Sequence, residues 1–228
     1  MESLQRFLAV PLDTLPFLLL VLIIAFTVHE FAHAFFAWKF GDPTAKMLGR
    51  VTLNPAKHLD VFGMLLFVIA GFGWARPVPV NRANFKNQRM MSIVVSAAGP
   101  LSNLILAFIG TLLMHLCINM EWIPLFEASR GQEALYIFLQ YFITYNIVLF
   151  LFNLIPLPPL DGYRIIEDLA PRRIQAKLMQ FEQYSIFIFL LIVFIPMLNE
   201  LTIGKLFSLI QPIFFTFDRA AGFLLSWI

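Results

Sequence analysis

Long apolar runs are the feature that most restricts what this chain can fold into. A helix needs about 20 consecutive apolar residues to cross the hydrocarbon core of a bilayer. Hydrophobic residues make up 60% of the chain and charged residues only 13%, whereas soluble domains contain about 45–50% apolar and about 25% charged residues. A soluble core could not bury so much apolar surface, so we expect an all-α membrane protein. Five segments approach or meet the length of a transmembrane helix: residues 15–38, 90–116, 134–155, 184–201 and 206–227.

A sixth apolar run, residues 61–74, is too short to cross a membrane comfortably. It contains Gly63, Gly71 and Gly73, and it indicates a re-entrant segment, with a full crossing as the alternative. We therefore expect a polytopic bundle of five to six transmembrane helices, with a re-entrant or β-like element between the first two.

Lysine and arginine are concentrated in three of the loops. Residues 39–60, 76–89 and 162–180 each hold four of them. The loop at 117–133 holds one arginine beside three glutamates. Basic loops stay on the cytoplasmic side of a membrane, and a re-entrant segment at 61–74 would place all three basic loops there. We therefore expect a multi-pass protein of the plasma or inner membrane. The net charge of +2 is too small to suggest nucleic acid as a partner.

The strongest chemical signal is the sequence His29-Glu30-Phe31-Ala32-His33. Histidines four residues apart on a helix share one face, so both imidazoles can bind one metal ion. The pattern indicates zinc, with Glu30 placed one residue along to act on water rather than to bind the metal. The alternative is that these are buried polar residues that satisfy helix contacts, but ionisable groups inside an apolar helix are costly and functional by default.

Two histidines leave a zinc ion short of a third protein ligand. The candidates are Asp13, Asp42, Asp60, Asp161, Asp168, Asp218 and His58. Asp161 stands out because the proline-rich segment 156–160 precedes it and Gly162 follows, which places a carboxylate on a turn at membrane depth. The alternative is that Asp161 N-caps the next helix. If the basic loops are cytoplasmic, Asp161 and residues 29–33 both lie toward that side and can meet at similar depth.

These motifs together resemble the site-2 protease family of intramembrane metalloproteases, peptidase family M50, in its compact prokaryotic subgroup without PDZ or CBS domains. The matching segments are His29-Glu30-x-x-His33, Leu53-Asn54-Pro55, Gly73-Trp74-Ala75-Arg76-Pro77-Val78-Pro79-Val80-Asn81, Gly99-Pro100-Leu101-Ser102-Asn103 and Asn153-x-x-Pro156-x-Pro158-x-x-Asp161-Gly162. The resemblance implies one zinc ion per chain held by His29, His33 and Asp161. It also implies that Glu30 is the catalytic base and that transmembrane or membrane-adjacent peptide bonds are cleaved.

The resemblance also implies the domain organisation. Residues 1–228 are expected to form a single integral membrane metalloprotease domain, with a catalytic core at about 13–165 and C-terminal helices at about 181–228. The expected partners are transmembrane protein or peptide substrates and the lipid bilayer, with the oligomeric state left open. Two other classes of protein could use the same residues: a membrane transporter that binds zinc without catalysis, and a non-catalytic scaffold of the same fold.

Three further polar residues are candidates for a supporting role. Asn153 could hydrogen-bond the substrate carbonyl or its developing oxyanion, or it could satisfy a broken helix end. Asn103 could be a partner of a zinc-bound histidine, while Gly99 near it is expected to pack against the helix that carries the histidines. His58, in a basic loop, is expected to be solvated or interfacial, with a metal role as the alternative.

An alternating pattern after the first long helix predicts the β-like element. In residues 46–53, the polar residues Lys46, Arg50 and Thr52 share one parity, although Leu48 breaks the alternation. We expect a short strand whose free edge clamps unwound substrate beside the zinc by strand addition.

Overall fold

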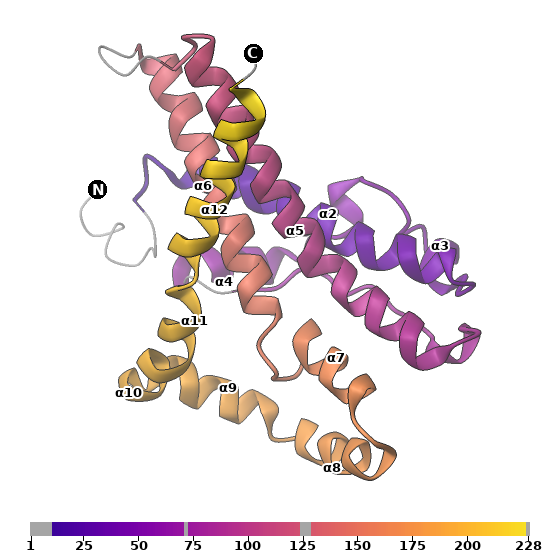
Figure 1. Ribbon diagram of the computed structural model, residues 1–228. Coiled ribbons are helices and arrows are strands. Elements are labelled where there is room, and N and C mark those ends of the chain that lie inside the picture. The colour runs from indigo at the N-terminus through magenta and orange to yellow at the C-terminus, as the bar shows by residue number, and fades with distance from the viewer. Residues whose placement is uncertain (1–10, 71–72, 124–128, 227–228) are drawn as a thin grey trace.

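The computed structural model describes residues 11–70, 73–123 and 129–226, and every regular element in these ranges is a helix (Figure 1). The long helices are α2 (Leu15–Lys39), α5 (Gln88–Asn119) and α6 (Arg130–Asn153). The shorter ones are α3 (Thr44–Met47), η1 (Pro55–Lys57), α4 (Val61–Ala70), η2 (Arg82–Asn84), α7 (Asp161–Leu169), α8 (Arg172–Glu182), α9 (Ser185–Phe194), α10 (Pro196–Asn199), η3 (Glu200–Gly204), α11 (Lys205–Phe207) and α12 (Ile210–Leu225). Gly71, residues 124–128 of the predicted outer loop and Trp227 lie outside the described residues.

Helices α2, α5 and α6 are long and apolar enough to cross a membrane. If the bent pair Arg173–Glu182 and Phe187–Phe194 counts as one span, the described residues contain up to four, fewer than the five or six expected. The fourth expected span is interrupted because Pro196 disfavours helical backbone at Ile195 before it. The fifth is reduced to α12, whose 16 residues extend about 24 Å, against a hydrocarbon core of about 30 Å.

Helix α5 is the centre of the packing (Figure 1). Helix α2 lies against its N-terminal half, and α6 and α12 lie along its C-terminal half. Small residues permit these close contacts, since a Cβ on Gly110 would lie only 2.8 Å from a ring carbon of Phe142 on α6. Buried apolar side chains fill the interfaces: Leu18, Leu22, Phe26 and Leu149 between α2 and α6, and Ala107, Ile143, Ile147 and Leu151 between α5 and α6.

The short apolar run at 61–74 begins with α4, and its two ends lie side by side. The amide of Arg76 donates a hydrogen bond of 2.7 Å to the carbonyl of His58. A Cβ on Gly63 would overlap the carbonyl oxygen of Trp74, so only glycine allows the two backbones to touch there. The run at 61–74 therefore begins and ends at the same level of the molecule.

Residues 46–53 form no strand, contrary to the prediction. The segment begins inside α3, and Gly49 in the turn that follows has a φ of +66°. The ammonium of Lys46 lies 4.1 Å from the ring centroid of Trp38, while Arg50 points inward and is buried. The alternation of polar residues thus comes from a helical turn followed by the buried guanidinium of Arg50. Residues 46–53 therefore offer no strand edge that could bind a substrate.

Polar contacts join the three basic loops on one side of the bundle. The carboxylate of Asp42 accepts hydrogen bonds of 2.7 Å from the backbone amide of Asn81 and of 2.7 Å from the side chain of Asn84. The guanidinium of Arg82 forms an ion pair of 2.8 Å with Asp168 on α7. The segments after α2, before α5 and within α7 therefore share one face of the molecule.

Asp42 is the polar centre of this loop assembly and is fully buried. Burial alone would raise the pKa of its carboxyl, but hydrogen bonds from Thr44, Asn81 and Asn84 hold that pKa below the ordinary value of 3.8. A pKa lowered by folding means that the charged form stabilises the fold. That stabilisation is present above pH 3.8 and is lost as the pH falls through the lower folded-state value.

We expect Asp42→Ala to lower the thermal stability of the purified protein at neutral pH. The substitution leaves buried donors without an acceptor, which typically costs about 2–4 kcal/mol, and the fall in Tm can be followed by intrinsic fluorescence in detergent. Asp13→Ala removes the same charge from an exposed position and is the matched control. Equal Tm values for the two variants would show that Asp42 does not hold the loops together.

Candidate active site

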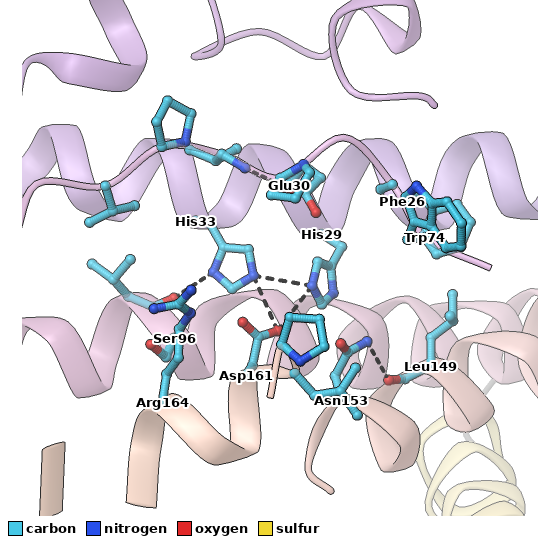
Figure 2. A pocket seen from close by; sticks show the side chains of 18 of the residues that line it. Phe26, His29, Glu30, His33, Trp74, Ser96, Leu149, Asn153, Asp161 and Arg164 are labelled. Carbon is cyan, nitrogen blue, oxygen red and sulfur yellow. Dashed lines mark hydrogen bonds and ion pairs between the residues drawn. The ribbon is translucent and has the colours of Figure 1, made fainter. Parts of the chain in front are cut away.

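Helix α2 carries His29 and His33 one turn apart, and α7 begins with Asp161 facing them (Figure 2). The Nε2 atoms of the two imidazoles are 3.1 Å apart. Oδ2 of Asp161 lies 3.2 Å from Nε2 of His29 and 3.3 Å from Nε2 of His33. Both histidines are buried, so the structure brings three of the predicted site residues to one buried point.

The spacing of these three atoms suits a tetrahedral metal site. With metal–ligand bonds of about 2.0–2.1 Å, the ligand atoms of a tetrahedron lie about 3.3–3.4 Å apart. The observed separations of 3.1, 3.2 and 3.3 Å are close to that edge length. Two imidazoles and a carboxylate are also a donor set that zinc accepts, with the fourth position left for water or substrate. The side chains present therefore fit a zinc ion.

The outer nitrogens of both imidazoles are held by α5. Nδ1 of His33 lies 2.7 Å from the carbonyl oxygen of Val95, and Nδ1 of His29 lies 2.7 Å from Oδ1 of Asn103. Because both partners are acceptors, each Nδ1 carries the proton and donates it. The lone pair of each Nε2 is then free and faces Asp161.

Asn103 extends this contact to a third helix. It is fully buried, and its side-chain amide donates a hydrogen bond of 2.9 Å to Oδ1 of Asn146 on α6. Asn146 in turn donates to the carbonyl of Phe142 at 2.8 Å. The contact between His29 and Asn103 is the one that the sequence suggested. Asn146 was missed, although an asparagine inside an apolar helix is a recognisable signal of an interhelical hydrogen bond.

Gly99 on α5 forms the wall behind the two imidazoles. A Cβ at this position would overlap Nε2 of His33 and would lie 2.7 Å from Nε2 of His29. Both Nε2 atoms face Asp161, so the absence of a side chain at Gly99 keeps their shared space open. The sequence predicted helix packing for Gly99, and its contact with these imidazole nitrogens is more specific than that.

Glu30 is buried on α2 beside the histidines and lines the same cavity. Its Oε2 accepts a hydrogen bond of 3.0 Å from the backbone amide of Val78. Arg50 holds this stretch of backbone, since its guanidinium donates to the carbonyl of Arg76 and, at 3.1 Å, to that of Pro77. On sequence alone, Arg50 was named only in the strand pattern and Val78 only in the matching segment 73–81, and neither was assigned a contact with Glu30 or its neighbours. Both act through backbone contacts between loops, which leave no side-chain pattern in the sequence.

Asp161 is the first residue of α7, and the N-cap position belongs to Leu160. The alternative in which Asp161 serves as the N-cap is therefore wrong, and its carboxylate is free to face the histidines. Gly162 fixes where α7 starts, because a Cβ there would overlap the carbonyl oxygen of Leu154 just beyond α6. Close backbone contact at this glycine sets Asp161 at the depth of the histidines.

A cavity of about 480 Å³ lies over these groups. Phe26, Trp74 and Leu149 contribute apolar surface to it, and Asn153 contributes a polar side chain (Figure 2). The Asn153 amide donates a hydrogen bond of 2.9 Å to the carbonyl of Leu149, which is the contact expected of a polar residue at a broken helix end. Its role toward a substrate carbonyl stays a prediction.

The remaining candidates for the third ligand lie outside this group: Asp13, Asp42, Asp60, Asp168, Asp218 and His58. Asp218 on α12 pairs with His115 on α5 at 2.8 Å, in the other half of α5. His58 is fully buried, its Nε2 lies 2.7 Å from the carbonyl oxygen of Thr52, and burial lowers its pKa. The expectation of a solvated His58 is therefore wrong, and this histidine is part of the loop core.

Several known proteins are similar to this chain in sequence. The family model of peptidase family M50 matches residues 17–134 and 118–196. "Putative zinc metalloprotease YwhC" of Bacillus subtilis (strain 168) is 53% identical over 223 residues, which cover 92% of this chain and 99% of that protein. "Putative zinc metalloprotease Rip2" of Mycolicibacterium smegmatis (strain ATCC 700084 / mc(2)155) is 31% identical over 204 residues, 87% of this chain and 73% of the relative. No solved structure matches significantly. The chain belongs to peptidase family M50.

Proposed function

We propose that this protein is an integral membrane zinc metalloprotease that hydrolyses peptide bonds of transmembrane or membrane-adjacent substrates, in regulated intramembrane proteolysis. The observation that carries the proposal is the convergence of His29, His33 and Asp161, with Glu30 beside them, on a helix apolar enough to cross a membrane. Membership of peptidase family M50 supports peptide hydrolysis, and the names of the relatives, which describe zinc metalloproteases, support the metal.

In this proposal His29, His33 and Asp161 hold one zinc ion per chain. The near-tetrahedral spacing of their ligand atoms supports this assignment. So do the contacts to Val95 and Asn103, which turn each Nε2 toward the site. When bound, zinc polarises the scissile carbonyl and lowers the pKa of water toward ~7.

Glu30 is the general base. Its carboxylate lines the cavity without joining the three ligand atoms, so it can accept a proton from the attacking water and pass it to the leaving amine. The Val78 amide fixes Oε2 of Glu30, which leaves Oε1 as the oxygen that takes the proton. In this proposal Asn153, on the cavity wall, donates to the substrate carbonyl as negative charge develops, once its amide leaves the Leu149 carbonyl.

The active site faces the cytoplasm in this proposal, and the protein resides in the plasma or inner membrane. Three basic segments share one face of the bundle through Asp42 and Arg82, and basic segments remain cytoplasmic. The side-by-side ends of the run at 61–74 support re-entrance, because a segment that crossed would separate His58 from Arg76.

Glu30→Gln is expected to keep the zinc and the fold but to lose hydrolysis. The amide is nearly isosteric with the carboxylate but cannot accept the proton, so the rate should fall by about 10²–10⁴ or more. Detergent-purified protein would be incubated with a panel of transmembrane peptides, with and without a zinc chelator, and its zinc measured by elemental analysis.

Glu133→Gln makes the same chemical change at an exposed position near the start of α6 and should cleave like the wild type. If Glu30→Gln cleaves at the wild-type rate, Glu30 is not the general base. A zinc-loaded wild type that cleaves no peptide would instead favour a transporter or a scaffold.

Gly99→Ala is expected to lower the zinc content of the purified protein well below one ion per chain. The new methyl group would overlap Nε2 of His33 and would lie 2.7 Å from Nε2 of His29. Gly131→Ala is the control, because a Cβ there meets nothing within 4 Å. Full zinc occupancy in a folded Gly99→Ala protein would contradict the assigned metal position.

Lys57, Lys86 and Lys177 are expected to share one side of the membrane, opposite Glu133. Each of these four residues would be replaced singly by cysteine in a Cys117→Ser background. Each variant would be labelled in intact cells with a thiol reagent that cannot cross the membrane. We expect labelling at position 133 alone. Opposite accessibility of positions 57 and 86 would mean that the run at 61–74 crosses the membrane.

A further inference from the structure

The ionised side chains that line the cavity differ in whether they already have partners. Glu30 accepts from the Val78 amide, and Asp161 faces the two histidines. Arg82 is bound to two carboxylates of α7. Arg164 also lines the cavity, and within the described ranges it forms no hydrogen bond or ion pair. One guanidinium beside the site is therefore left without a hydrogen-bond acceptor among the described residues.

Arg164 stands one helical turn after Asp161 on α7. Residues three apart on a helix lie on the same face, so the cationic group and the carboxylate point the same way. Figure 2 shows the Arg164 side chain rising beside Asp161 toward Ser96 and His33. All four residues line the one cavity. A peptide bound across Asp161 would pass within reach of this guanidinium.

The natural partners of Arg164 on its own helix are bound elsewhere. Glu167 and Asp168 lie three and four residues along α7, where acidic side chains normally pair with an arginine. Arg82 from the loop before α5 holds both of them, at 3.2 Å to Glu167 and 2.8 Å to Asp168. Asp168 still interacts electrostatically with Arg164, and its Oδ2 has no hydrogen-bond partner within the described ranges. Neither carboxylate forms an ion pair with Arg164 there, so the guanidinium of Arg164 is available to a ligand.

We propose that Arg164 is a specificity-determining residue that binds the carboxylate of an aspartate or glutamate close to the scissile bond of the substrate. The inference rests on the proposed function and names a class of substrate for it. A guanidinium presents parallel N–H donors that match a carboxylate, and the pair is stronger than neutral hydrogen bonds. A substrate segment that covers Arg164 removes water from it, which raises the cost of leaving that charge unpaired and favours an acidic side chain over a neutral one.

The test is an aspartate scan of a peptide that the wild-type enzyme cleaves. Aspartate and asparagine are placed in turn at each position next to the scissile bond, and kcat and KM are measured for each pair. At one position we expect kcat/KM to favour aspartate by about tenfold, chiefly through KM, because the contact is made in the ground state as well. Arg164→Gln should bring that ratio close to one, and Arg164→Glu should favour a lysine peptide at the same position.

Arg173→Gln is the matched control, since Arg173 is an exposed arginine of α8 that does not line the cavity. It should keep the aspartate preference, and all variants should keep their zinc by elemental analysis. Cleavage with no aspartate preference at any position, or a preference that survives Arg164→Gln, would overturn this inference alone. A zinc-loaded wild type that cleaves no peptide would overturn the proposed function and this inference with it.

Discussion

Close contact between α2 and α5 is the constraint on which the rest of the structure depends. Two imidazoles lie inside an apolar helix, and buried polar groups are costly unless they are hydrogen-bonded. Helix α5 meets that requirement with the Val95 carbonyl and the Asn103 side chain, and it leaves room for both rings at Gly99. A larger separation of the two helices would leave both Nδ1 atoms without these acceptors.

The third member of the site depends on loops rather than on this interface. Asp161 reaches the histidines because the backbone at Gly162 touches the carbonyl of Leu154. The far end of α7 is tied to η2, where Arg82 pairs with Asp168, and to the first turn of α5, where Arg89 donates to the carbonyl of Leu169. Residues of the basic loops therefore also hold one wall of the cavity.

The features predicted well from the sequence were those that depend on local patterns of residues. The pairing of His29 with His33 follows from helical spacing alone, and the all-helical fold follows from apolar composition. The prediction of a strand at 46–53 was wrong. A short alternation of polar and apolar residues does not distinguish a strand from a helical turn that is followed by a buried arginine, here Arg50. The expected number of crossings is not confirmed: three helices of the described residues are long and apolar enough to span, or four with the bent pair. Hydropathy reports composition, whereas the break before Pro196 is a matter of backbone geometry. The Val78 amide carries no side-chain signal at all.

The hydrogen bonds that run from His29 through Asn103 to Asn146 join α2, α5 and α6. Ligand affinity and helix association are then thermodynamically linked, because an ion that binds only the assembled helices stabilises their assembly by the same free energy. The linkage is reciprocal. Under the proposed function, a change that separates α5 from α6 would weaken retention of the ion by the same factor by which the bound ion resists the separation. The proposed metal site is in this sense also a cross-link between the helices of the bundle.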